Sequence, residues 1–236
     1  MRLIGKKRLK ILDVGGGAGF YSFWLHDLGH EVHLLDITPV NIDYAEKEAR
    51  RTSKMLGSMQ VADARKLPFD SCSFDLVLLL GPLYHLTKSQ DRIKALREAK
   101  RVLKKGGLLV CAAISRYAAL LNGYYDNWII NPHFPSMVHH ELKNGQHRNP
   151  YGVSKFFTTA YLHRPEDLIA EMDKTGFSKS CLYAIESFGW ILTDFKKQWC
   201  DTKYKKLIFE MIRAVETEKS LMGMSAHILG VARCAK

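Results

Sequence analysis

The chain has 236 residues, of which 47% are hydrophobic and 25% charged, and its formal net charge is +11. These values are ordinary for a folded globular protein and exclude disordered, collagen-like and coiled-coil chains. The length suits one α/β domain whose core needs neither disulfides nor metal. The basic charge allows RNA or another polyanion as a partner. The lysines and arginines are scattered over several expected helices, however, so we favour a solvated surface.

Signals for membrane insertion, secretion and metal binding are weak. No apolar run approaches the roughly 18 residues that a membrane span needs. The first ten residues carry charges but no apolar segment of the kind found in signal peptides. The five cysteines have scattered spacings and no CxxC pair, so neither a disulfide framework nor a zinc site is expected. We therefore expect a reduced, cytoplasmic protein with no membrane partner, and the oligomeric state stays open.

Strand-like and helix-like segments alternate along the first half of the chain. Helices are expected to begin at Phe20, at Pro39 after Thr38, and after a candidate capping box from Thr87 to Gln90. The last of these should end at Gly106. Short apolar runs predict strands at 9–14, 31–36, 59–62, 74–80 and 108–114. This alternation predicts a doubly wound, mostly parallel α/β sheet.

The alternation stops between residues 116 and 163, where aromatic, histidine, asparagine and proline residues are frequent and no long periodic segment occurs. Regularity resumes with an expected helix from Pro165 to Gly176. Strands at 177–185 and 227–232 follow, with a helix near 204–217 between them. No repeat or linker divides the chain. We expect a single domain over 1–236, with a substrate-lid insertion at about 116–163.

A glycine-rich loop, Asp13-Val14-Gly15-Gly16-Gly17-Ala18-Gly19, joins the first strand to the first helix. Glycines let the backbone turn sharply and approach a ligand, and Asp36 at the end of the second strand can accept hydrogen bonds from a ribose. A nicotinamide dinucleotide would want glycine or alanine where Phe20 stands, because Phe20 is too bulky for close helix–strand packing. The pattern therefore favours S-adenosylmethionine over NAD.

Three stretches resemble the motifs of class I S-adenosylmethionine-dependent methyltransferases. They are ILDVGGGAGFYSFWLHDLGHEVHLLDIT, ADARKLPFDSCSFDLVLLLGPLYHL and EAKRVLKKGGLLVCAAIS. The combination looks most like the small-molecule branch related to ubiquinone/menaquinone-biosynthesis methyltransferases, and it covers roughly residues 9–115. The resemblance implies a Rossmann-like, seven-stranded sheet with an antiparallel last strand, S-adenosylmethionine as cofactor, and methyl transfer as the reaction. It does not specify the acceptor.

The resemblance also implies roles for single residues. Asp13 would support the loop and the methionine amino group, and Asp36 would take the ribose hydroxyls. Ile37 would pack on adenine, while Asp63 would accept from the adenine amino group unless it only caps a turn. The expected cofactor-binding set is Asp13, Gly15, Gly17, Gly19, Asp36, Ile37, Asp63, Ala64, Leu80 and Gly81.

The loop that follows the fourth strand, residues 81–86, should face the transferred methyl group, because ligands bind at the carboxyl ends of parallel strands. His85 is a candidate general base and Tyr84 could orient the acceptor, although each could equally be structural. The loop lacks the [Asn/Asp]-Pro-Pro-aromatic pattern of enzymes that methylate nucleic-acid amines. A small-molecule acceptor is therefore favoured. An RNA or protein methyltransferase, or a non-catalytic cofactor-binding module, remains an alternative.

The insertion should supply acceptor contacts, and Trp128, Arg148 and Tyr161 are the candidates. Arg148 could hold an acceptor carboxylate or pin the lid to the core. Histidines 139, 140 and 147 suggest a metal site, but histidines in a polar loop more often face solvent, so no metal is expected. Methyl transfer from a sulfonium is an in-line displacement in which alignment is the main contribution of the enzyme.

Overall fold

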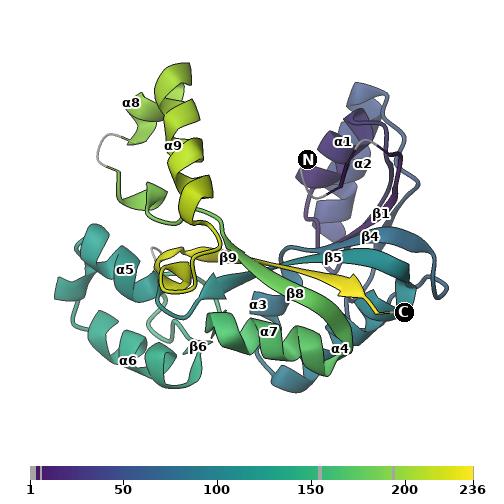
Figure 1. Ribbon diagram of the computed structural model, residues 1–236. Helices are drawn as coiled ribbons and strands as arrows, with labels where there is room; N and C mark the ends of the chain where they lie inside the picture. The colour runs from purple at the N-terminus through teal and green to yellow at the C-terminus, as the bar shows by residue number, and fades with distance from the viewer. Residues whose placement is uncertain (1–3, 6, 154–155, 193–194, 236) are drawn as a thin grey trace.

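A mostly parallel sheet lies between two layers of helices in this computed structural model (Figure 1). The structure describes residues 4–5, 7–153, 156–192 and 195–235, so the ends of the expected domain and residues 154–155 of the insertion lie outside it. The strands predicted from the sequence are β1 (Lys10–Val14), β2 (Glu31–Asp36), β3 (Ser58–Val61), β4 (Phe74–Leu79), β5 (Leu103–Ser115), β8 (Phe177–Ala184) and β9 (His227–Cys234).

The strand order confirms the expected fold class. Strands β3, β2, β1, β4 and β5 are neighbours in that order and run parallel, and β9 pairs antiparallel with β5 on one side and β8 on the other. Two short strands, β6 (Gln146–His147) and β7 (Ala160–His163), extend the sheet at the carboxyl end of β5. Because β9 is antiparallel, its amino end lies beside the carboxyl ends of β5 and β8.

The near-continuous apolar composition of the central strands follows from burial on both faces. On one face, Ile11, Leu76 and Val110 pack beneath α1 (Phe20–Asp27), and α2 (Pro39–Thr52) covers the neighbouring part of that face. On the other face, Leu12 and Val77 belong to the cluster that α4 (Ser89–Val102) and α7 (Pro165–Lys174) complete. Figure 1 shows these two helix pairs on opposite sides of the sheet.

Most helix starts agree with the sequence, and one helix differs at both ends. The capping box expected at Thr87–Gln90 is wrong, because Lys88 is the N-cap of α4 and no side chain caps this helix. The Thr87 carbonyl accepts a hydrogen bond from the Arg92 guanidinium instead. The expected helix end at Gly106 is also wrong, because α4 ends at Val102 and Leu103 already pairs with Phe74 in the sheet.

The insertion is more regular than its sequence indicates. It contains α5 (Ala118–Tyr125) and α6 (Phe134–Asn144), a short 3-10 helix at Trp128–Ile130, and the two short strands. The sequence shows no long periodic segment here and did not predict these two helices. Phe134, Met137 and Val138 recur at helical spacing on α6 and form a separate apolar cluster with Phe156. Helices of 8 and 11 residues are too short to give a strong periodic signal.

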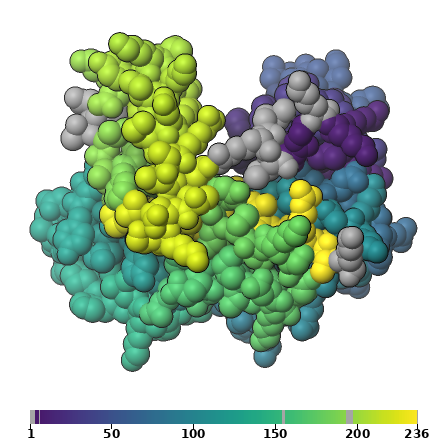
Figure 2. All heavy atoms as spheres, viewed as in Figure 1, coloured from purple at the N-terminus to yellow at the C-terminus, as the bar shows by residue number. Residues whose placement is uncertain are grey.

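The remaining helices are α3 (Pro82–His85) after β4, and α8 (Phe195–Cys200) and α9 (Thr202–Val215) between β8 and β9. Asp201 caps α9 by accepting from the backbone amides of Lys203 and Tyr204. Figure 2 shows the surface hollowed between α9 and α1, where a cavity of about 540 Å³ opens on the sheet. Among the residues placed here, no helix has the length and apolar character to cross a bilayer.

Candidate functional site

The glycine loop between β1 and α1 is shaped by three glycines with positive φ: Gly15 (70°), Gly17 (60°) and Gly19 (86°). Asp36 at the end of β2 fixes this loop. Its Oδ2 accepts from the Gly17 amide at 2.9 Å, and its Oδ1 accepts from the Thr38 amide at 2.9 Å. A Cβ at Gly17 would meet nothing within 4 Å. The loop therefore presents open backbone at the carboxyl edge of the sheet, as a ligand cradle requires.

A buried carboxylate supports the loop from below. Asp13 is 1% exposed; its Oδ2 accepts from the Ser22 hydroxyl at 2.7 Å, and its Oδ1 has no hydrogen-bond partner among the described residues. Burial raises the pKa of Asp13 to about 6, against the lowering effect of Ser22, and the nearby Asp36 charge adds to the rise. A Cβ on Gly16 would come within 2.5 Å of this carboxylate, so the loop closes only over glycine.

The steric role expected of Phe20 is wrong. Its side chain is 78% exposed and does not pack between helix and strand. The close helix–strand approach occurs instead at Gly16 and Gly19, where an added Cβ would meet Leu34. The preference for S-adenosylmethionine over a dinucleotide therefore depends on the loop pattern and not on the bulk of Phe20.

The other candidate cofactor residues follow the ends of neighbouring strands, so the parallel topology brings them to the same edge. Ile37 follows β2 and is 62% exposed, with its apolar surface free for a planar group. Asp63 and Ala64 follow β3; the Asp63 carboxylate accepts from the Arg65 amide and guanidinium. Leu80 and Gly81 follow β4. Open backbone, an exposed apolar side chain and carboxylates fit a ligand with an adenine, a ribose and a cationic amine.

The two candidate catalytic residues lie together on α3. The rings of Tyr84 and His85 are 4.7 Å apart, and the ring of Phe157 from the insertion stacks near His85 at 6.1 Å. Desolvation lowers the pKa of His85, with the Asp36 charge acting in the opposite direction, so the imidazole is neutral near pH 7. No hydrogen bond orients its ring among the described residues. The insertion therefore contacts the loop after β4.

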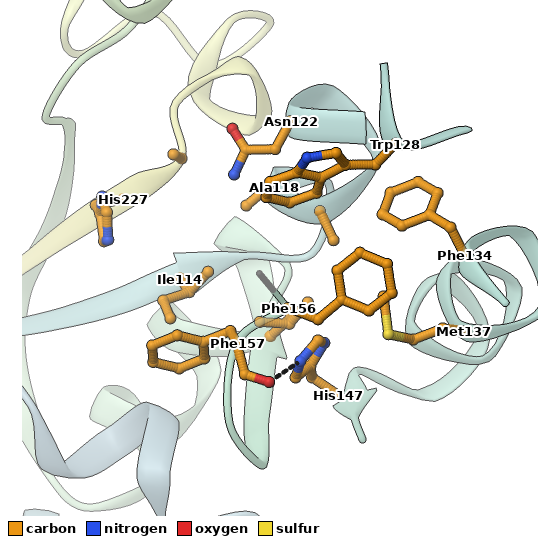
Figure 3. Close-up of a pocket in the computed structure, with 13 residues that line it drawn as sticks. Ile114, Ala118, Asn122, Trp128, Phe134, Met137, His147, Phe156, Phe157 and His227 are labelled. Carbon is orange, nitrogen blue, oxygen red and sulfur yellow. Dashed lines mark hydrogen bonds between the residues drawn. The ribbon is translucent and has the colours of Figure 1, made fainter. Parts of the chain in front are cut away.

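An apolar cavity of about 480 Å³ lies at the carboxyl ends of β5 and β7 (Figure 3). The aromatic rings of Trp128, Phe134 and Phe156 line one side and His227 lies at the opposite side. Its wall holds no lysine, arginine, aspartate or glutamate. Its complete lining is Ile114, Ala118, Ala119, Asn122, Trp128, Phe134, Met137, His147, Phe156, Phe157, Leu162, Ala226 and His227.

His147 borders this cavity but its ring is already satisfied. Its Nδ1 lies 2.6 Å from the Glu141 carboxylate and its Nε2 lies 2.8 Å from the Phe157 carbonyl. The exposed His139 and His140 make local contacts to Pro135 and Asn144 on α6. Within the described ranges, no three histidine, cysteine, aspartate or glutamate side chains are placed to hold a metal ion.

Two of the candidate acceptor residues have structural contacts. Arg148 donates to the His147 carbonyl at 2.9 Å and to Gln146 Oε1 at 2.8 Å, and it is absent from the cavity wall. The Tyr161 ring lies 3.6 Å from the guanidinium carbon of the buried Arg92, and its hydroxyl accepts from Arg116. Trp128 is the one of the three that lines the cavity.

Sequence reasoning missed a histidine–glutamate pair at the same edge. Glu186 follows the carboxyl end of β8, and its Oε1 lies 2.5 Å from His227 Nδ1, at the amino end of β9. Ile114 of β5 pairs with His227 in the sheet. The sequence held a signal for the position of His227, because an antiparallel last strand must bring its first residue to the carboxyl edge of the parallel strands.

Comparisons with known proteins identify similar methyltransferases. Residues 12–111 match the family model described as "Methyltransferase domain". A ubiquinone/menaquinone biosynthesis C-methyltransferase UbiE of Sinorhizobium fredii is 31% identical over 141 residues, which is 56% of this chain and 53% of that protein. A glycine/sarcosine N-methyltransferase of Parasynechococcus marenigrum is 40% identical over 102 residues, 42% of this chain and 36% of that protein.

The fold comparison extends over nearly the whole chain. A crystal structure of an S-adenosylmethionine-dependent methyltransferase from Methanosarcina mazei matches with a TM-score of 0.62 at 20% identity, covering 96% of this chain and 92% of that one. The chain spans about half the length of the UbiE relative that it matches. The family model covers the glycine loop and the chain to residue 111 in β5, and the fold likeness extends over 96% of the chain.

Proposed function

We propose that this chain, whose residues 12–111 match the methyltransferase-domain family model, is a class I S-adenosylmethionine-dependent methyltransferase that methylates a small molecule. One observation carries the proposal: Phe157 lines the apolar cavity of the insertion and also stacks near His85 in the loop after β4. This ring connects the expected cofactor edge to a cavity of a size suited to a small acceptor.

In this proposal the cofactor lies along the glycine loop. Asp36 takes the ribose hydroxyls, Ile37 packs on adenine, and Asp63 and the Ala64 amide meet its polar edge. The main-chain carbonyls of Leu80 and Gly81 face the methionine ammonium. When bound, S-adenosylmethionine supplies an electrophilic methyl group on a sulfonium. The open space over Gly17 and the exposed face of Ile37 support this placement.

The chain then contributes alignment and exclusion of water. Holding two reactants in line supplies about 7–11 kcal/mol of the barrier reduction in favourable cases. We propose that residues 116–163 form the lid, with Trp128 against the acceptor, and that Tyr84 and His85 contact the reacting groups. Arg148 and Tyr161 remain candidates for acceptor binding; their contacts support a role in fixing the lid. Exclusion of water favours a step in which the sulfonium charge disappears.

The cavity also supports a class of acceptor. Its wall is mainly aromatic and aliphatic and holds no acidic or basic side chain apart from two histidines, of which His147 is satisfied. An acceptor with an uncharged, apolar body fits such a wall better than a zwitterion or a phosphorylated chain. The free state of all five cysteines supports the expected reducing, cytoplasmic location.

The test combines binding with product identification. Calorimetry should detect binding of S-adenosylmethionine and should show that NAD does not bind more tightly. Incubation of the chain with methyl-labelled cofactor and a metabolite extract should give a labelled small molecule, identified by mass spectrometry. Binding without any labelled product would favour a non-catalytic module. Labelled RNA, together with salt-dependent RNA binding, would favour the nucleic-acid alternative.

A further inference from the structure

The Glu186–His227 pair has the geometry of an oriented base. The His227 Nδ1 lies 2.5 Å from Glu186 Oε1, while Glu186 Oε2 accepts from the Ser225 hydroxyl at 2.8 Å and from the His227 amide at 2.9 Å. The Ser225 hydroxyl oxygen accepts in turn from the amides of Glu186 and Ser187. The carboxylate is thus fixed on both oxygens, and the imidazole has one nitrogen held and the other free.

The pair lies where two cavities meet. His227 lines the apolar cavity of the insertion, and both His227 and Glu186 line the cavity of about 540 Å³ beside α1. This second cavity is also lined by Leu80 and Tyr84, the residues that follow β4. The His227 side chain is 51% exposed, so a ligand can reach its ring. In Figure 3 this ring lies across the cavity from Trp128 and Phe134.

We propose that His227, held by Glu186, accepts the proton of the acceptor's attacking group. This inference rests on the proposed methyl transfer and applies to acceptors that arrive protonated, as a hydroxyl, thiol or ammonium. The carboxylate fixes the tautomer with hydrogen on Nδ1, which leaves the Nε2 lone pair directed to the ligand side. The same arrangement of carboxylate, imidazole and nucleophile recurs in unrelated hydrolases because it orients the base and stabilises the imidazolium.

The step balances without a further reactant. The acceptor's hydrogen moves as a proton to Nε2, and the lone pair left on the acceptor atom forms the new bond to the methyl carbon. The carbon–sulfur bond breaks, and its electron pair stays on sulfur. The positive charge therefore passes from the sulfonium to the imidazolium, which lies against the Glu186 carboxylate.

His85 is the competing candidate, and the two histidines differ in ways that can be measured. His85 has no orienting hydrogen bond among the described residues, and desolvation holds its pKa below 6.5. The hydrogen bond to Glu186 raises the pKa of His227 above 6.5, against the lowering effect of burial. Other titratable groups around His227 on the two cavity walls are Tyr21, Tyr84 and His147. If His227 accepts the proton, the rate of methyl transfer should rise with pH in the range above 6.5. If His85 accepts it, the rate should rise in the range below 6.5.

The first measurement needs no turnover. In protein labelled with ¹⁵N-histidine, the signal of His227 is assigned because it disappears in His227→Gln. The titration of that signal should move to lower pH in Glu186→Gln. The neutral form should also lose its preference for hydrogen on Nδ1. A His227 titration that Glu186→Gln leaves unchanged would overturn the pairing and with it the proposal.

The second measurement is kinetic, with labelled cofactor and a panel of hydroquinone, catechol, thiophenol, aniline and glycine beside the metabolite extract. His227→Ala should lower kcat about 10²–10⁴-fold and leave cofactor affinity within about twofold, and added imidazole should restore part of the rate. His139→Ala on α6 is the matched control and should keep the full rate, because its ring is exposed and hydrogen-bonds, among the described residues, to the Pro135 carbonyl alone.

The outcomes separate the two proposals. Product formation that survives in His227→Ala but is lost in His85→Ala would overturn the dyad and leave the methyltransferase function standing. Absence of product from every acceptor would remove both, since no proton would then be transferred. In a third outcome, imidazole does not restore kcat in His227→Ala and the loss of kcat equals the loss of folded protein. That outcome would overturn the proposal and assign His227 a structural role.

Discussion

The glycine-loop edge and the insertion border one site, but they are built from different kinds of group. At the loop, backbone amides and buried carboxylates provide the polar contacts. Asp36 alone accepts three hydrogen bonds, from Gly17, Thr38 and Asn41. In the insertion, aromatic rings enclose a cavity, and the polar His147 has both ring nitrogens already occupied. The loop holds individual polar atoms in place by hydrogen bonds, whereas the insertion provides a cavity wall of defined shape.

This difference decides what a substitution will do in each region. Backbone geometry at the loop admits only certain residue types, because a Cβ on Gly16 would collide with Asp13 and Leu34. A cavity wall tolerates any apolar side chain of similar volume. Changes at the loop should therefore act on stability and cofactor affinity, and changes in the insertion should act on either lid stability or acceptor affinity, depending on burial.

The largest expected effect separates two phenylalanines of the insertion. Phe134 is 1% exposed in the cluster of α6, whereas Phe157 is 47% exposed at the cavity wall. Phe134→Ala should lower the free energy of unfolding by about 3–5 kcal/mol, the usual loss for a buried aromatic ring. Phe157→Ala should change stability by less than about 1 kcal/mol and raise the acceptor KM. Urea unfolding of the two variants measures both, and equal losses would mean that Phe157 is a core residue.

The next effect concerns the buried acid under the loop. The folded pKa of Asp13, about 6, lies above the unfolded value of 3.8. Between these values the native state holds a proton that the unfolded state has lost, so this group lowers stability as pH rises. The loss is about 2 kcal/mol from pH 4 to pH 7.

The difference in unfolding free energy between the natural chain and Asp13→Asn isolates this contribution. Asp13→Asn should be relatively more stable at neutral pH and should bind S-adenosylmethionine more weakly. The exposed Asp70→Asn serves as control and should show neither change. A difference that is constant with pH would contradict the assignment of a raised pKa to this carboxyl.

The two regions also explain what the sequence could predict. The loop and the residues after β2, β3 and β4 were predictable because parallel topology brings the ends of β1 to β4 together, whatever the side chains do. The contacts of Tyr161 were not, because its ring stacks on Arg92, 69 positions away. Arg148 donates to its neighbours His147 and Gln146, and the residue pattern does not specify those hydrogen bonds. α5 and α6 were missed because their apolar positions serve a local cluster and not the main core.

A third prediction tests the cofactor edge. Asp36→Ala should weaken S-adenosylmethionine binding by about 1.5–3 kcal/mol, the scale for hydrogen bonds to a charged group. Asp36→Asn keeps one acceptor oxygen for the loop amides and should weaken binding less. Calorimetry on variants with unchanged near-UV circular dichroism gives the affinities. Unchanged affinity in Asp36→Ala, or tighter binding of NAD, would refute the nucleotide site.

The smallest expected effect lies in the insertion, at the buried pair of His147 and Glu141. Burial of the ring opposes protonation, but the hydrogen bond and charge of Glu141 and the Phe157 carbonyl outweigh it and raise the pKa of His147 above 6.5. A raised folded pKa means that the stabilisation is complete below the unfolded value of 6.5 and is lost as pH rises through the folded pKa.

Glu141→Gln removes the charge, so its stability deficit should shrink toward high pH. Hydrogen exchange at β6 and α6 should report this loss locally, because the pair joins these two elements. A deficit that does not change with pH would contradict the raised pKa, because it would show that the histidine is neutral throughout.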